Sequence, residues 1–126
     1  MATQRFNPDK KRTSPSIQTV GLVTNSVLLS YTLQDNSSNF VEIVITGRET
    51  TTGAIFISKK AVAVQKLLTA PVLIGSVISL IPDAVSLSLI GVLTALVISG
   101  NDIQVLTTTI LGVTIDWQVE MTIFTN

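Results

Sequence analysis

The sequence of 126 residues contains neither cysteine nor histidine. Without cysteine there are no disulfides, thiolate metal sites or cysteine nucleophiles, and without histidine the usual general base and the commonest metal ligand are missing. These absences exclude most hydrolytic mechanisms. We therefore predict that the chain is not an enzyme and uses no cofactor and no metal ion.

Charge is also scarce, because only 13% of the residues are Asp, Glu, Lys or Arg, against roughly 25% in typical soluble domains. The mean hydropathy is +0.56, so a free monomer would expose apolar or hydroxyl-rich patches of the kind that mark partner surfaces. A formal net charge of zero weakens repulsion between copies and supplies no field that attracts nucleic acid. We expect self-assembly and no nucleic-acid partner.

A long stretch with few charges, residues 67–99, contains Asp83 alone among charged residues. Its two uncharged halves are each shorter than the ~20 apolar residues that a spanning helix requires, and both contain Ser and Gly. A membrane-associated protein stays open as an alternative to the functions considered below, but membrane insertion is not expected. The first apolar run begins only at Ile17, so no signal peptide is expected either.

Apolar and polar residues alternate through much of the chain, which is the period of a half-buried strand. Such alternation occurs at residues 27–33 and 41–45, and the turn-forming residues 35–39 between these two runs are expected to be a hairpin connection. A second turn is expected at residues 100–102. Two further strands, 72–80 and 85–90, are predicted on either side of a Pro82-Asp83 turn. In the final segment one face carries Ile115, Trp117, Val119, Met121 and Ile123, and the other carries Asp116, Gln118, Glu120 and Thr122.

These patterns predict an all-β protein, an antiparallel β-sandwich or jelly-roll-like fold of roughly eight to ten short strands without a helix. A single sandwich domain over residues 16–126 would follow an extended basic N-terminal arm over residues 1–15, in which Pro8 and Pro15 discourage regular structure. The arm is either a solvated terminus or a segment that contacts a neighbouring subunit. In the second case its partner-binding residues would be Arg5, Lys10, Lys11 and Arg12.

Few side chains suggest chemistry. Asp116 and Glu120 share a face of one strand, but four residues of strand separate them by ~13 Å, too far for paired carboxylate catalysis. Trp117 lies on the apolar face, which favours a core position. Two turns carry oxygen-bearing side chains that stabilise turns themselves and that form the possible binding edge of a ligand-binding module: Asp35, Asn36, Asn39, Asn101 and Asp102.

Several segments together resemble a small β-sandwich module of the structural proteins of tailed bacteriophages. They are residues 41–48 (VEIVITGR), a Thr-rich loop ending in Gly53-Ala54, residues 97–105 (VISGNDIQV) and residues 114–117 (TIDW). The resemblance implies a virion protein of the capsid decoration or tail-fibre-tip type, commonly assembled as a trimer. Residues 67–96 are more hydrophobic than is usual in that module, which favours a component embedded among neighbours.

The sequence therefore predicts a virion structural protein, foremost a capsid decoration or cement protein that stabilises the particle. Its partners would be itself, as a homotrimer or larger assembly, and other virion proteins such as a major capsid protein. The alternative is a phage tail-fibre or receptor- or glycan-binding module.

Overall fold

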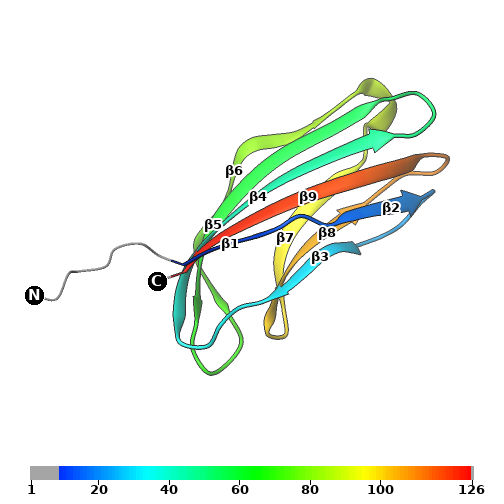
Figure 1. The fold of residues 1–126 in the computed structure, drawn as a ribbon. Coiled ribbons are helices and arrows are strands. Elements are labelled where there is room, and N and C mark those ends of the chain that lie inside the picture. Colours follow the sequence, from blue (N-terminus) through cyan, green and yellow to red (C-terminus); the bar gives the residue numbers. More distant parts are fainter. Residues whose placement is uncertain (1–8, 126) are drawn as a thin grey trace, which may run out of the picture.

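The computed structural model describes the backbone of residues 9–125 and the side chains of residues 13–125, and this part of the chain forms two antiparallel β-sheets (Figure 1). The six-stranded sheet has the order β1-β9-β4-β5-β6, and β2 also pairs with β9, following β1 along the same edge. The three-stranded sheet has the order β3-β8-β7. The strands are β1 (Asp9–Thr13), β2 (Ser16–Val20), β3 (Ser26–Thr32), β4 (Ser37–Glu49), β5 (Ile55–Lys66), β6 (Val72–Val85), β7 (Leu93–Ser99), β8 (Asp102–Thr108) and β9 (Thr114–Thr125).

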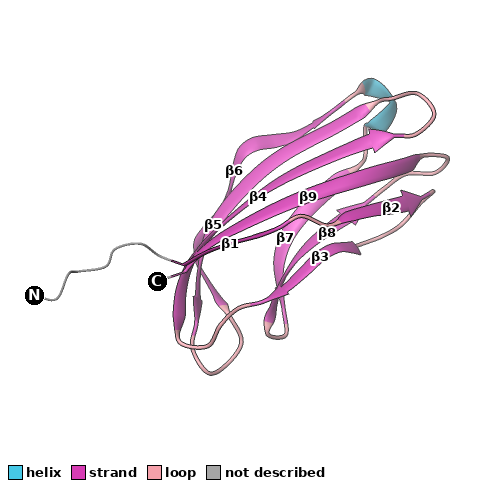
Figure 2. Cartoon of the chain, viewed as in Figure 1, coloured by secondary structure: helices cyan, strands magenta, loops and turns pink. Residues whose placement is uncertain are grey.

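The all-β sandwich predicted from the alternating pattern is confirmed. Within residues 9–125 the helical structure is one short 3₁₀ turn, η1 (Leu87–Leu89), seen in cyan in Figure 2. The described chain contains no helix with the length and hydropathy needed to cross a membrane.

The core lies between the two sheets and follows the predicted faces of the long strands. In β4, Val41, Ile43 and Ile45 are fully buried, while the alternate residues point outward. The five apolar residues of β9 predicted to share a face are all buried as well. Alternate side chains of a strand point to opposite faces, so one apolar face per strand is enough to build this core.

Trp117 is a buried member of the core and is held by both ring packing and a hydrogen bond. Its ring meets Phe56 edge to face, with centroids 5.2 Å apart and an interplanar angle of 71°. Its indole Nε1–H donates to Thr19 Oγ1 at 2.9 Å, which satisfies a polar group that would otherwise be buried without a partner. Gly47 of β4 lies opposite Trp117 and leaves room for the ring.

The turn at residues 35–39, expected to be a hairpin connection, joins the two sheets instead. β3 pairs with β8 in the three-stranded sheet, whereas β4 pairs with β5 and β9 in the other. Asn36 takes a positive φ of 56° at the turn, a conformation that Asn tolerates better than most residues. The residue types therefore predicted the turn correctly, but the prediction that the strands on either side of it pair with each other was wrong.

The predicted turn at Pro82-Asp83 is also wrong, because β6 continues through these residues, with a shift of its register against β5 at this point. β6 pairs with β5 and lies at the end of the strand order, where a proline without an N–H is tolerated. The Asp83 carboxylate accepts hydrogen bonds from the Thr94 N–H at 3.0 Å and from Lys60 Nζ at 3.1 Å. The strand predicted over residues 85–90 is instead the end of β6 followed by η1.

Part of the predicted N-terminal arm belongs to the sheet. β1 pairs with β9 from Asp9 opposite Thr125 to Thr13 opposite Met121. The separation of residues 1–15 from the domain at 16–126 stays a prediction, and Arg5 lies outside the described residues.

Candidate binding surfaces at the loop end and on the outer sheet face

The two predicted binding loops lie at the same end of the sandwich. Asp35 and Asn36 are in the β3–β4 connection, and Asn101 and Asp102 are in the turn between β7 and β8 (Figure 1). Thr32 at the end of β3 pairs with Asp102 at the start of β8, so the long-range register brings the loops together.

Most of the oxygen atoms at this end already have partners within the chain. Asp35 Oδ1 accepts a hydrogen bond from Lys66 Nζ at 2.6 Å, and Asp102 accepts from Thr32 Oγ1 at 2.5 Å. Asn39 is only 6% exposed, and its Nδ2 donates to Ser37 Oγ at 2.8 Å, so it lies inside rather than on a binding edge. Asn36 and Asn101 are the exposed amides of the predicted set, and a binding role for these loops stays a prediction.

The predicted arm residues fall on one edge of the six-stranded sheet. By strand register, Lys10 lies opposite Phe124, Lys11 opposite Ile123 and Arg12 opposite Thr122. This places three of the four proposed partner-binding residues along a sheet edge, and their contact with a neighbouring subunit remains a prediction.

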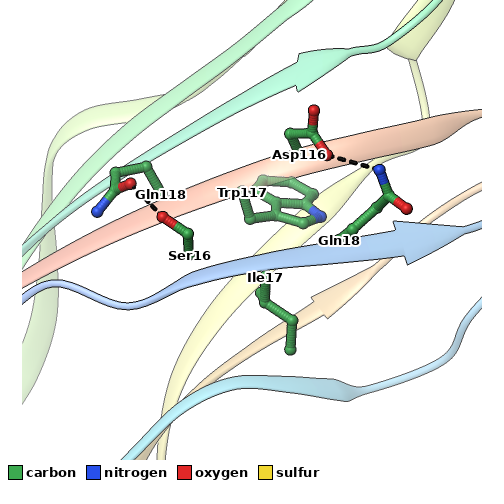
Figure 3. A pocket seen from close by; sticks show the side chains of 6 residues that line it. All are labelled: Ser16, Ile17, Gln18, Asp116, Trp117 and Gln118. Atoms are coloured by element: carbon green, nitrogen blue, oxygen red, sulfur yellow. Dashed lines mark hydrogen bonds between the residues drawn. The ribbon is translucent and has the colours of Figure 1, made fainter.

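A second surface, which the sequence did not single out, is a shallow hollow of about 360 Å³ where β2 lies beside β9. The register sets Ser16 opposite Gln118 and Gln18 opposite Asp116. Ser16 Oγ donates to Gln118 Oε1 at 2.6 Å, and Gln18 Nε2 donates to Asp116 Oδ1 at 2.7 Å, with Trp117 between these two pairs (Figure 3).

The hollow continues over the neighbouring strands of the same sheet. A second depression of about 360 Å³ is lined by Thr46 and Arg48 of β4 and by Ile55 and Ile57 of β5, and it shares Asp116 and Gln118 with the first. Arg48 is the register partner of Asp116, and Thr46 that of Gln118. We call the two depressions together the outer-face groove.

The outer-face groove presents amide, hydroxyl, carboxylate and guanidinium groups in two neighbouring rows across the strands, beside an aliphatic flank. As at the loop end, some of these groups already have partners within the chain. Such groups both donate and accept hydrogen bonds, so the groove suits a ligand rich in hydroxyl or amide groups. Its members come from segments about 100 residues apart, which is why sequence alone did not assemble them. The one sequence signal that pointed to the groove was the polar outward face of the last strand, which contains Asp116 and Gln118.

The two carboxylates with clearly shifted pKa values lie outside the groove. Hydrogen bonds from the Thr52 N–H and hydroxyl lower the pKa of Glu49, with a further one from the Thr51 N–H. Burial acts to raise the pKa of Asp83, but hydrogen bonds from the Thr94 N–H, from hydroxyls and from Lys60 outweigh it and lower the pKa overall. In both cases the folded chain favours the carboxylate, which is a structural role. No cluster of three or more Asp and Glu residues suited to a metal ion occurs in the described part of the chain.

The fold and the outer-face groove define an antiparallel β-sandwich with a polar sheet surface. No protein-family model matches the sequence, and comparison with curated proteins finds no related sequence. Among solved structures, the chain is similar to the tailspike protein of Acinetobacter baumannii phage AM24, with 12% identity and a TM-score of 0.50 over 91% of this chain and 26% of that protein. A tailspike protein of Acinetobacter baumannii bacteriophage Fri1, described as a capsular polysaccharide depolymerase, shows 19% identity and a TM-score of 0.47 over 94% of this chain and 20% of that one.

The chain thus spans about a quarter or less of these tailspike proteins, and at this identity the likeness is one of fold. The all-β sandwich is a fold that also occurs within phage tailspikes, in line with the phage module that the sequence resembles; capsid decoration specifically gains no support. One expectation is corrected: the prediction that the chain is not an enzyme is withdrawn, since carboxylate-based hydrolysis needs neither Cys nor His, and one of the two tailspike proteins is itself described as a capsular polysaccharide depolymerase.

Proposed function

We propose that the chain is a receptor-binding-type module of a phage tail spike or tail fibre, carried in the virion, which binds bacterial surface saccharide through the outer-face groove. The observation that carries the proposal is the fold shared with a phage tailspike protein over 91% of the chain. This supports the alternative that the sequence left open in preference to a capsid decoration protein.

The chemistry of the groove supports saccharide as the ligand class. Gln18, Asp116 and Arg48 offer donors and acceptors suited to sugar hydroxyls. Gln118, whose amide bonds Ser14 and Ser16, would have to exchange one of these bonds for one to the sugar. Ile55 and Ile57 supply an aliphatic flank against which the carbon face of a sugar ring can pack. The groove is open and shallow, which fits one segment of a long polymer better than a small molecule that must be enclosed.

The proposal is tested by measuring binding of the purified, fluorescently labelled chain to surface polysaccharides from a panel of encapsulated bacteria that includes Acinetobacter baumannii. Isothermal titration with the best polysaccharide then compares three variants with the parent chain. We expect the Gln18→Ala/Gln118→Ala double variant to bind at least ~10-fold more weakly, since hydrogen bonds to the ligand are lost.

Gln65→Ala is the matched control, because Gln65 is another exposed glutamine on the same sheet, outside the groove. Asn101→Ala tests the loop end. Loss of binding in Asn101→Ala with full binding in the groove variant would move the site to the loops. Absence of binding to every polysaccharide in the panel would overturn the proposal.

A further inference from the structure

The free edge of the six-stranded sheet carries a row of exposed aliphatic side chains. β6 is the longest strand, with 14 residues, and within residues 9–125 it pairs on one side only, with β5. We call this surface the β6 patch. It consists of Val72, Ile74, Ile78, Leu80 and Ile81, which are 44–60% exposed.

Strand register places most of the patch on the outer side of the sheet. Val72 lies opposite Gln65 and Ile74 opposite Ala63, and both partners belong to the outward-facing set of β5. Ile78 and Ile81 lie opposite Ala61 and Lys59 of the same set. Four of the five patch residues therefore lie on the outer side of the sheet, while exposed Leu80 lies at a register shift between Ser79 and Ile81.

β6 has only some of the features that normally protect a free edge, because it is long and nearly uncharged, although its pairing with β5 is interrupted by three register shifts. Natural edge strands are kept from pairing by short length, charged side chains, proline or β-bulges. The charge of β6 is Asp83 alone, and its carboxylate is occupied by Lys60 Nζ at 3.1 Å and Thr94 Oγ1 at 2.8 Å. Pro82 lies near one end of the strand. The opposite edge of the sheet differs, because the sequence of β1 is DKKRT, four charged residues in five.

The exposed area is of the size that a second protein would cover. The β6 patch together with Leu67 and Leu68, which are 54% and 76% exposed, presents about four fully exposed aliphatic side chains. At roughly 100 Å² of apolar surface for each side chain, this is ~400 Å² per chain. A standard interface buries ~800 Å² per partner, of which somewhat more than half is apolar.

We propose that a second copy of this chain docks against the β6 patch. The patch is uncharged, and the chain has a formal net charge of zero, so two identical patches meet without repulsion. An aliphatic patch is complementary to itself, as an interface between identical copies requires. The patch is separate from the outer-face groove, so this inference does not depend on the proposed function.

The first experiment measures the mass of the full chain by light scattering over a range of concentrations. We expect reversible association, weakened at least ~100-fold in the Ile74→Lys/Ile78→Lys variant, because lysine charge would have to be buried at the contact. Leu111→Lys is the control, since Leu111 is 79% exposed in the β8–β9 turn and lies away from β6. Far-UV circular dichroism checks that each variant keeps its strands.

A second experiment does not depend on a disruptive change. The chain contains no cysteine, so a single-cysteine variant reports only contacts of the substituted position. We expect Ile78→Cys to form disulfide-linked dimers under mild oxidation, and Leu111→Cys to stay monomeric. The proposal would be overturned if the chain were monomeric at all concentrations. It would also be overturned by an oligomer that both lysine variants leave unchanged and in which Ile78→Cys does not cross-link, and the patch would then be assigned to another partner.

Discussion

Replacing Gly47 by alanine should destabilise the sandwich through one specific contact. A Cβ at this position would lie 2.9 Å from Trp117 Cε3 and Cζ3 and 3.0 Å from Ile115 Cγ2. Carbon atoms normally pack at ~3.5–4.0 Å, so one of the three groups must move. Trp117 is 1% exposed and Ile115 is fully buried, and therefore neither can swing into solvent.

Two opposing effects set the magnitude. Overpacking a close-packed core by a methyl group costs ~1–3 kcal/mol. Alanine also reduces the freedom of the unfolded chain, which stabilises by ~0.4–1 kcal/mol where the native backbone suits it. Gly47 is not among the residues with positive φ, so this gain applies. We expect the Gly47→Ala variant to lose about 1–2 kcal/mol in free energy of unfolding.

Urea unfolding followed by far-UV circular dichroism measures this loss, and it does not rely on the fluorescence of the single tryptophan. The same substitution in a Trp117→Phe background should cost at least ~0.5 kcal/mol less, because the smaller ring relieves the contact. An alanine variant as stable as the parent, or an equal loss in both backgrounds, would refute the reasoning.

Three further predictions concern buried polar groups. Thr19→Val removes the acceptor of the buried Trp117 indole N–H and should cost ~1–3 kcal/mol in urea unfolding. Asp35→Ala removes the carboxylate that pairs with Lys66, whose side chain is only 4% exposed. Because Asp35 is 60% exposed, we expect the free energy of unfolding to fall by only ~1–2 kcal/mol, and adding Lys66→Met should restore most of it. The pKa of Asp83 lies below its ordinary value of 3.8, so its carboxylate stabilises the fold above that pH, and this stability is lost as pH falls through the lower folded pKa. The stability difference between parent and Asp83→Asn, measured from pH 7 to 2.5, should therefore narrow towards the acid end, and a constant difference would contradict it.

The sequence predicted what depends on the local period of side chains, and it failed where distant strands decide the outcome. β9 was predicted residue by residue, because one of its faces is apolar and the other polar. The turn at Asp35-Asn36 was recognised from its residue types, but these do not say which sheet the next strand joins. Pro82 was taken as a break, yet a proline is compatible with an edge strand. The edge position of β6 depends on pairing that the local pattern does not contain.

The same limit applies to the candidate sites. Asp116 and Gln118 were placed correctly on the outward face of the last strand. Their partners Ser16 and Gln18 lie about 100 residues away in the chain, and only the antiparallel register of β2 with β9 brings them together. Conversely, Asn39 belonged to the predicted loop set by its neighbours in sequence, whereas its side chain is buried and hydrogen-bonded to the start of β4.

The outer-face groove and the β6 patch, if both proposals hold, should act together on a polymeric ligand. The groove lies over β2, β9, β4 and the start of β5, whereas the β6 patch pairs with the later part of β5, so a copy docked on β6 leaves the groove open. A dimer would carry two grooves and hold an immobilised polysaccharide by both. We expect Ile74→Lys/Ile78→Lys to bind a short free oligosaccharide as the parent does, but to bind the immobilised polymer at least ~10-fold more weakly. Equal binding to the polymer would show that the grooves act singly, and weaker binding to the free oligosaccharide would place β6 within the ligand site itself.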